Sequence, residues 1–236
     1  MTKFQELLSQ HIASSLLKQQ NLSNFLGDHN WNVDLETGKV DFGKGRSYPI
    51  QIIGTESEVS GTWLWGWANE GSDIPAHLLT CTTTLQELGA REGIEELTQP
   101  QIELDKVDGH MLAMVACGVC KANAYYRGPY DGGALFFTMQ QMPLQNQQTA
   151  SPLEIINIMS SVISQFPVNH KTMVQSFLNH QGFQLAEGEG EIIASVANGS
   201  DITVKFDNLG RINGMETTAV PEPQSTAKKS WWRFGK

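Results

Sequence analysis

Three tryptophans at alternate positions constrain this chain more than any other feature of its sequence. Trp63, Trp65 and Trp67 lie within the run TWLWGWAN at residues 62–69. Side chains alternate between the two faces of a β-strand, so this spacing predicts a strand over 62–68 with all three indoles on one face. The residues between them are apolar or small. The run is therefore typical of a central strand that is covered on both sides.

Two interpretations of this tryptophan ladder lead to different functions. An exposed ladder would be a platform on which sugars, bases or cationic ligands stack. A buried ladder would be the main wall of a hydrophobic core, and each indole N–H would then need a hydrogen-bond acceptor. Large aromatic side chains are mostly buried in folded proteins, which favours the core.

The spacing of apolar residues predicts helices and antiparallel strands along the rest of the chain. A hairpin is expected over 30–42 around Thr37-Gly38, a further strand at 50–54, and a second hairpin over 125–140. Helical spacing predicts helices over 3–20, from Ser72-Asp73-Ile74-Pro75 to about Leu88, and over 110–124. Beyond residue 150 we expect two helices and four short strands, at 152–166, 171–181, 183–187, 191–197, 201–207 and 211–217.

These elements predict an α+β fold in two parts. Residues 1–140 would form a mainly antiparallel sheet packed with helices. Residues 141–151 are polar, rich in glutamine and contain Pro143, so we interpret them as a linker. A smaller helix-helix-β-meander module would follow at 152–218. Residues 219–236 then form a flexible tail that is basic and aromatic.

Charge and composition exclude several classes of function. The chain has a net charge of −9, and residues 219–236 carry +3, so residues 1–218 carry −12. Such a body repels a phosphate backbone, and we expect no nucleic-acid partner. The sequence contains no signal peptide and no apolar run long enough to span a membrane, so the expected location is the cytoplasm. Three cysteines are too few, and odd in number, for a disulfide framework.

A search for catalytic and cofactor motifs finds none that is complete. There is no P-loop, no dinucleotide-binding glycine pattern, no nucleophile elbow and no zinc-protease motif. Cys117-Gly-Val-Cys120 would need two further ligands to hold zinc, and it lies in an apolar stretch of small residues. We interpret it as buried helix packing, with redox or metal chemistry as the alternative. No cofactor, metal or catalytic residue is expected.

Several short motifs resemble a bacterial family known only as domain of unknown function 6882. The most specific are the run Ile53-Gly54-Thr55-Glu56-Ser57 and the tryptophan segment at 62–69. Glu36-Thr37-Gly38, Asp108-Gly109 and Tyr126-Arg127 with Pro129 are also similar. The resemblance covers roughly residues 1–140. It implies an α+β domain and assigns no reaction.

Two functions remain open at this point. The first is a non-enzymatic cytosolic module that binds ligands or other proteins. The second is an enzyme or small-ligand-binding protein with a site near the tryptophan ladder. In that site, Arg127 would clamp a carboxylate or phosphate that Asn69 orients, provided that the 62–69 strand lies beside the 125–140 hairpin. The candidate ligand-binding residues are Trp63, Trp65, Trp67, Asn69, Tyr126, Arg127 and Asp131.

The end of the chain is the other candidate site. Lys228-Lys229-Ser230-Trp231-Trp232-Arg233-Phe234-Gly235-Lys236 combines three large aromatic residues with four cations. We expect Trp231, Trp232, Arg233 and Phe234 to dock on a protein partner or on the acidic body of this protein. Weak peripheral contact with an anionic membrane surface is the alternative.

Overall fold

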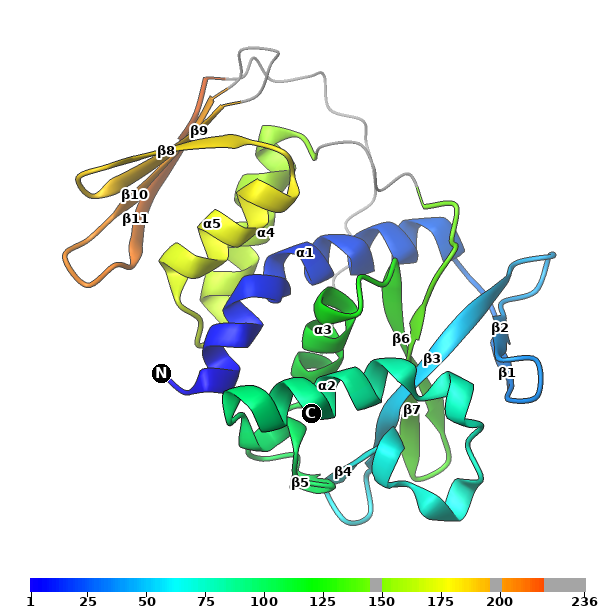
Figure 1. Ribbon diagram of the computed structural model, residues 1–236. Coiled ribbons are helices and arrows are strands. Elements are labelled where there is room, and N and C mark those ends of the chain that lie inside the picture. Colours follow the sequence, from blue (N-terminus) through cyan, green and yellow to red (C-terminus); the bar gives the residue numbers. More distant parts are fainter. Residues whose placement is uncertain (145–149, 196–200, 219–236) are drawn as a thin grey trace.

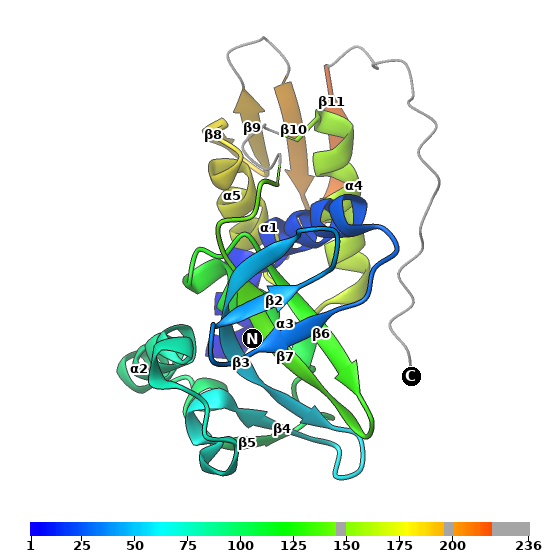
Figure 2. The ribbon, with the colours of Figure 1, turned by 90° about the vertical axis from the view of Figure 1, so that its right-hand side faces the viewer.

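A computed structural model describes residues 1–144, 150–195 and 201–218 of the chain. It has the expected α+β architecture, with two antiparallel sheets, five α-helices and four short 3-10 helices in the described ranges (Figures 1 and 2). The α-helices are α1 (Lys3–Leu26), α2 (Thr80–Glu92), α3 (Gly109–Val119), α4 (Pro152–Gln165) and α5 (His170–His180). The 3-10 helices are η1 (Gly66–Ala68), η2 (Glu70–Ser72), η3 (Ala76–Leu78) and η4 (Glu95–Leu97).

The larger sheet is organised around one long strand, β3. β7 pairs with one edge of β3, while β2 and β4 share the other edge near its two ends. β1 extends the sheet beyond β2, β5 beyond β4, and β6 beyond β7. The seven strands are β1 (Asn32–Asp34), β2 (Lys39–Asp41), β3 (Ser47–Ser57), β4 (Thr62–Trp65), β5 (Gln101–Glu103), β6 (Ala124–Tyr130) and β7 (Gly133–Met139).

A bulge in β3 at Ile53 sets the register of the sheet. Ile52 lies opposite Phe137, while Gly54 lies opposite the neighbouring Phe136, so one residue of β3 has no partner in β7. Ile52 and Ile53 are both fully buried, but they belong to two different hydrophobic clusters. The strand therefore supplies apolar side chains to both faces of the sheet at this point.

The second sheet is a meander of four strands that packs against α4 and α5. Its strands are β8 (Gln184–Gly188), β9 (Glu191–Ser195), β10 (Asp201–Phe206) and β11 (Ile212–Thr217), hydrogen-bonded in sequence order. Alternate residues of the two central strands are completely buried, as expected when one face covers helices: Ile192, Ala194, Ile202 and Val204. The helix-helix-meander arrangement predicted from the sequence is confirmed.

Helix α1 contacts both parts of the molecule. It lies between α3, which covers the large sheet, and α5, which covers the small one (Figure 1). Ser15 Oγ donates a hydrogen bond of 2.8 Å to the carbonyl oxygen of Met114, and Thr172 Oγ1 donates one of 2.6 Å to Glu6 Oε1. One hydrophobic cluster runs through α1 into both parts. The boundary predicted at 141–151 stays a prediction, because residues 145–149 lie outside the described ranges.

The two hairpins expected from alternation are confirmed as β1–β2 and β6–β7. The helix expected to begin within 72–75 is not present there. The chain instead forms η2, a left-handed residue at Asp73 and η3, and α2 begins only at Thr80. The physical reason is Gln51 of β3, whose side chain accepts from the N–H of Cys81 and donates to the carbonyl of His77. This residue ties the start of α2 to the sheet.

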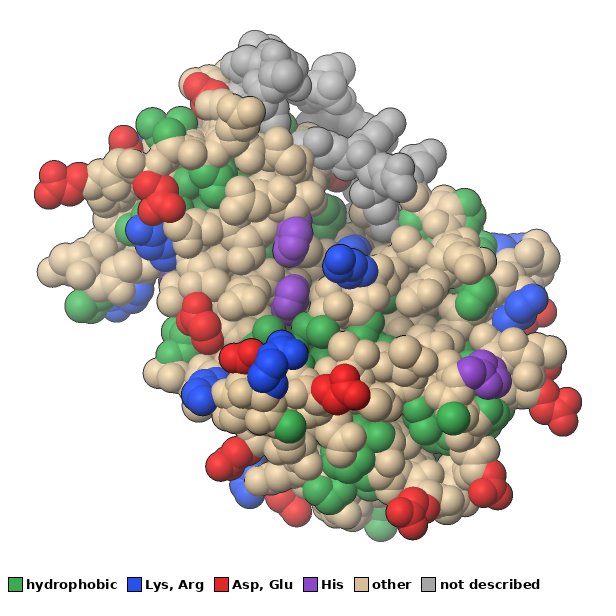
Figure 3. Space-filling view, viewed as in Figure 1, with side chains coloured by type: hydrophobic (Ala, Val, Ile, Leu, Met, Phe, Trp, Pro, Cys, Tyr) green, Lys and Arg blue, Asp and Glu red, His purple; other side chains and the backbone are tan. Residues whose placement is uncertain are grey.

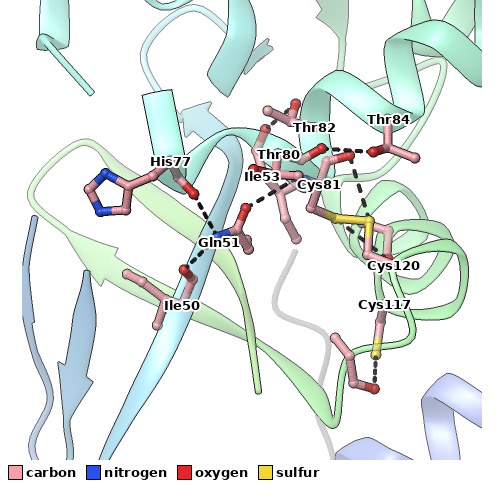
Figure 4. The surroundings of a disulfide bond; sticks show 12 residues. Ile50, Gln51, Ile53, His77, Thr80, Cys81, Thr82, Thr84, Cys117 and Cys120 are labelled. Carbon is pink, nitrogen blue, oxygen red and sulfur yellow. Dashed lines mark hydrogen bonds between the residues drawn. A yellow bond between two sulfur atoms is a disulfide. The ribbon is translucent and has the colours of Figure 1, made fainter. Parts of the chain in front are cut away.

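The three cysteines form one disulfide and not a framework, and this bond was not predicted from the sequence. Cys81 in the first turn of α2 is bonded to Cys120 at the end of α3 (Figure 4). Cys117 is a free thiol inside α3, fully buried, and burial raises its pKa. Cys120, the second cysteine of the C-x-x-C motif, therefore crosslinks two helices. The sequence does not indicate this pairing, because Cys81 lies 39 positions earlier in the chain. The first half is buried helix packing, as expected.

We predict that reduction of the Cys81–Cys120 bond destabilises the protein by about 3–4 kcal/mol, the chain-entropy value for a closed loop of this length. Thermal denaturation with and without a reductant measures the difference. A Cys117→Ala variant should keep the same sensitivity to reductant, because Cys117 is not in the bond. Identical melting curves under both conditions, or three alkylatable thiols in denaturant without reductant, would contradict the prediction.

Two histidines lie in contact where α1 meets α5. The rings of His11 and His180 are stacked with centroids 6.5 Å apart, and His180 Nδ1 is 3.1 Å from Ser14 Oγ. A side chain at Gly118 of α3 would overlap the ring of His11, so a glycine is needed at this position. Burial, together with the nearby His180 and Lys18, lowers the pKa of His11 to about 4.

This lowered pKa makes the stability of the protein depend on pH. The folded state holds His11 neutral, whereas the unfolded chain protonates it near its ordinary value of 6.5. Stability is therefore fully present above about pH 6.5 and is lost as the pH falls toward 4, by about 3 kcal/mol from this residue. A His11→Gln variant should lose less stability than the wild type over that interval in chemical denaturation. A variant of the exposed His77, His77→Gln, is the control; curves that stay parallel for wild type and His11→Gln would contradict the assignment.

Candidate functional site

Trp63 and Trp65 form part of the main core. Both are fully buried on the side of the sheet that faces α1 and α3, with their rings 5.4 Å apart in an edge-to-face arrangement. Trp65 Nε1 donates a hydrogen bond of 3.0 Å to the carbonyl of Glu96, while Trp63 Nε1 has no acceptor among the described residues. Phe136 of β7 packs against Trp63 at 5.2 Å. For these two residues the structure agrees with the core interpretation.

Trp67 does not continue the ladder, contrary to the expectation of one strand over 62–68. β4 ends at Trp65, and Gly66–Ala68 form the 3-10 helix η1. Pairing stops because β5 begins only at Gln101, opposite Leu64, and because β3 bulges at Ile53, just beyond the Gly54–Trp65 pair. Trp67 is half-buried against the core, and its Nε1 has no acceptor among the described residues.

The end of β4 leads directly to a cleft on the opposite face of the sheet. The cleft has a volume of about 420 Å³. Strands β3 and β7 form its floor. The segment around β1 forms one wall, and η2 with its flanking residues forms the other. The last residue of β6 closes one end. The lining residues are Trp31, Asn32, Val33, Leu35, Ile52, Thr55, Asn69, Ser72, Ile74, Tyr130 and Leu135.

An aromatic cluster holds Trp31 in the cleft wall. The Trp31 ring lies 6.0 Å from Tyr126 and 6.3 Å from Phe137, measured between ring centroids. Gly128 in β6 permits this position, because a Cβ there would lie 2.6 Å from the Trp31 ring. His29 adds a hydrogen bond of 3.0 Å between its Nε2 and the hydroxyl of Tyr126. The wall is therefore built before any ligand arrives.

Four polar side chains that line the cleft have no hydrogen-bond partner in the part of the chain that the structure describes. Asn32, Thr55, Asn69 and Ser72 make no side-chain hydrogen bond within the described ranges. The backbone of Asn69 is fixed, since its N–H donates to the carbonyl of Gly66. Mostly apolar walls with a few convergent polar groups are the usual form of a small-ligand site.

The three segments that form the walls and the end of the cleft are acidic. Residues 31–35, 69–74 and 130–135 contain Asp34, Glu70, Asp73 and Asp131, and they contain no Lys or Arg. Hydrogen bonds from Thr37 and Glu36 lower the pKa of Asp34 and keep it charged. Over the part of the chain that carries η1 to η3, the lower right of the surface in Figure 3 shows acidic and hydrophobic side chains. An anionic ligand would be repelled here.

Arg127 points to the other side of the sheet. Its Nε donates to Glu56 Oε2 at 3.0 Å, its Nη2 donates to Glu58 Oε1 at 3.4 Å, and its guanidinium lies 5.9 Å from the centre of the Phe136 ring. Burial raises the pKa of Glu56, and the contact with Arg127 lowers it again in part. The positive charge of Arg127 is thus engaged by two carboxylates of the protein.

A second group of titratable residues lies beside this ion pair, at the start of α3. His110 Nδ1 and the hydroxyl of Tyr125 are 3.0 Å apart. Burial lowers the pKa of His110 and raises that of Tyr125 well above its ordinary value. A side chain at Gly109 would overlap the Glu56 carboxylate, so this glycine allows α3 to pack closely on β3. No group of three metal-ligating side chains is found within the described ranges.

The structure brings together only some of the candidate residues. Asn69 lines the cleft, Tyr126 supports its wall through Trp31, and Asp131 follows the lining residue Tyr130. Arg127 and Asn69 do not converge, because β3 separates β4 from the β6–β7 hairpin. Trp231, Trp232, Arg233 and Phe234 lie outside the described residues. The sequence arguments missed Trp31, Thr55, Ser72, Tyr130 and Leu135, which reach one cleft only through pairing of distant strands.

The fold and the cleft define an α+β protein with a preformed, acidic-rimmed cleft on one face of an antiparallel sheet. The model of the Family of unknown function (DUF6882) matches residues 5–142, and the chain belongs to this family. No curated protein and no solved structure matches the chain. In the described ranges, no helix has both the length and the apolar character required to cross a membrane.

We predict that Trp65→Ala destabilises the protein by about 3–5 kcal/mol, the usual cost of truncating a large buried aromatic residue. Removal of this indole leaves a cavity beside Trp63 and deprives the Glu96 carbonyl of its donor. Urea denaturation measures the change. Asn69→Lys serves as the control and should stay within about 0.5 kcal/mol of the wild type, because Asn69 is only half-buried. An unchanged midpoint for Trp65→Ala would contradict the core assignment.

Proposed function

We propose that this protein is a non-enzymatic binding module whose cleft takes an aromatic group that carries a positive charge. The observation that carries the proposal is the cleft itself. It combines apolar and aromatic walls with four polar side chains that have no partner among residues 1–144, 150–195 and 201–218. Unused hydrogen-bonding groups in a concave apolar site favour a ligand that supplies the missing partners.

The charge of the ligand follows from the walls. Four carboxylates and no Lys or Arg belong to the wall and end segments, and the body of the protein carries −12. Such a field raises the local concentration of cations and repels phosphates and carboxylates. Trp31 and Tyr130 add aromatic faces, on which a cation or another ring can stack. Sugars and nucleotides satisfy these conditions less well than an aromatic cation does.

The location of the titratable groups supports binding without catalysis. Glu56, His110 and Tyr125, whose pKa values are shifted by burial, contact the helix-facing side of the sheet. The lining residues of the cleft include no histidine, cysteine, lysine or carboxylate. An enzyme with a site at Arg127 is the competing proposal, and the ion pairs of Arg127 with Glu56 and Glu58 argue against it.

We also propose that the protein is bacterial and cytoplasmic, and this proposal rests on the sequence. One structural observation opposes a reducing compartment. The Cys81–Cys120 disulfide is a bond that cytosolic proteins rarely keep.

The proposal is tested with two ligands that share an indole and differ in charge, tryptamine and indole-3-acetate. Isothermal titration of the full-length chain should detect tryptamine and not indole-3-acetate. Asn69→Lys places a positive charge in the cleft and should weaken tryptamine binding by about tenfold. Asn213→Lys makes the same charge change at an exposed position of β11 and should have no effect.

Two results would count against this function. Equal binding of both indoles would show that the acidic walls do not select the charge of the ligand. If Asn213→Lys weakened tryptamine binding as much as Asn69→Lys does, the site would lie outside the cleft.

A further inference from the structure

We infer that the cleft is occupied by the end of this same chain, residues 228–236. The inference rests on the proposed function, because it assumes that the cleft takes aromatic cations, and it goes further by naming the occupant. The nine residues contain Trp231, Trp232 and Phe234 with four Lys or Arg residues. Their chemistry is the complement of the cleft.

The charges of the two surfaces are opposite in sign. Residues 219–236 carry a net charge of +3, whereas the wall and end segments of the cleft carry only carboxylates as charged groups. Asp34 accepts two backbone hydrogen bonds and stays ionised, and Glu70, Asp73 and Asp131 are exposed at the rim. Attraction between such surfaces guides association and fixes its orientation.

The apolar surface extends beyond the cleft and gives room for more than one ring. Tyr130 lines the cleft and is 50% exposed, and Val59 in the adjacent turn is 90% exposed. A hydrogen bond from the N–H of Glu58 to the carbonyl of Gly132 holds these two turns side by side. One aromatic side chain can fill the cleft while a second covers Tyr130 and Val59.

The length of the chain beyond Thr218 lets its aromatic residues reach surface outside the small sheet. Trp231 lies 13 positions and Phe234 16 positions after Thr218, and fully extended chains of these lengths span about 45 and 55 Å. A folded body of this size has a radius of gyration of about 17 Å. A tethered segment is present at an effective concentration in the millimolar range, so even a weak site would be largely filled. An external aromatic cation would have to displace it.

The test uses the full-length chain and a fluorescent synthetic peptide of residues 226–236. Four proteins are compared by fluorescence anisotropy: the wild type, a tail variant with Trp231→Ala, Trp232→Ala and Phe234→Ala, and the same tail variant with either Asn69→Lys or Asn213→Lys. The tail variant should bind the peptide at least about tenfold more tightly than the wild type, because its cleft is no longer occupied. Asn69→Lys should abolish that gain, and Asn213→Lys in the same background should preserve it.

The possible results separate this inference from the proposed function. Equal peptide binding by the wild type and the tail variant would overturn self-occupation. Failure of the peptide to bind either protein, while tryptamine still binds, would overturn the inference and leave the proposed function intact. A wild-type dimer that the tail variant loses in light scattering would show that the occupant comes from a second copy. Equal peptide affinities together with tail-dependent sedimentation on phosphatidylserine vesicles would assign the tail to a membrane surface instead.

Discussion

The burial of Trp63 and Trp65 beneath α1 and α3 determines which side of the large sheet every other residue occupies. Side chains alternate along β4 and its neighbours, so the residues between and opposite these indoles must face away from the helices. Leu64, Thr55 and Leu135 are placed in this way, since Thr55 pairs with both of the other two. A shift of one residue in this register would exchange the two faces. The cleft can form on its face of the sheet because the two indoles are packed on the other face.

The two faces of the sheet have different chemistry. The helix-facing side holds the partly buried ion pair of Glu56 with Arg127 and the contact between His110 and Tyr125. Burial raises the pKa values of Glu56 and Tyr125 and lowers that of His110, which favours the neutral form of all three. These groups satisfy one another and hold α3 against β3. The cleft side holds neutral polar groups that have no partner in the described part of the chain, within an acidic rim. The polar groups that pair with one another and those that line the cleft are thus separated by one layer of sheet.

Much of the fold could be predicted from the sequence because its signals are local. The β1–β2 and β6–β7 hairpins follow from the alternation of apolar residues on either side of glycine turns. The helix-helix-meander module follows from the spacing of apolar residues between 152 and 217 and from the turn residues that separate them. The errors involve contacts between distant residues. The ladder ends at Trp65 because β3 bulges at Ile53, and α2 begins late because Gln51 binds the backbone of Cys81. The disulfide joins residues 39 positions apart, and the C-x-x-C motif that contains Cys120 does not indicate Cys81 as its partner.

The site was less predictable than the fold for the same reason. Among the candidates within the described ranges, only Asn69 lines the cleft, because it directly follows the ladder segment on which the sequence argument concentrated. Trp31, Thr55 and Tyr130 come from three separate segments that strand pairing brings together. Arg127 was predicted to clamp a carboxylate or phosphate of a ligand, but it pairs with carboxylates of the protein that lie about 70 positions earlier in the chain. Composition alone did indicate the acidic character of the surface.

We propose that the chain's own end covers the face of the sheet opposite the buried tryptophans. Hydrogen–deuterium exchange of the full-length wild type and of the tail variant tests this most directly, because it maps protection along the whole backbone without an added ligand. We predict faster exchange in the tail variant at 31–35, 69–74 and 130–135, with β8 to β11 unchanged as an internal reference. Equal protection of those three segments in both proteins, or a difference confined to α4, α5 and the small sheet, would contradict the claim.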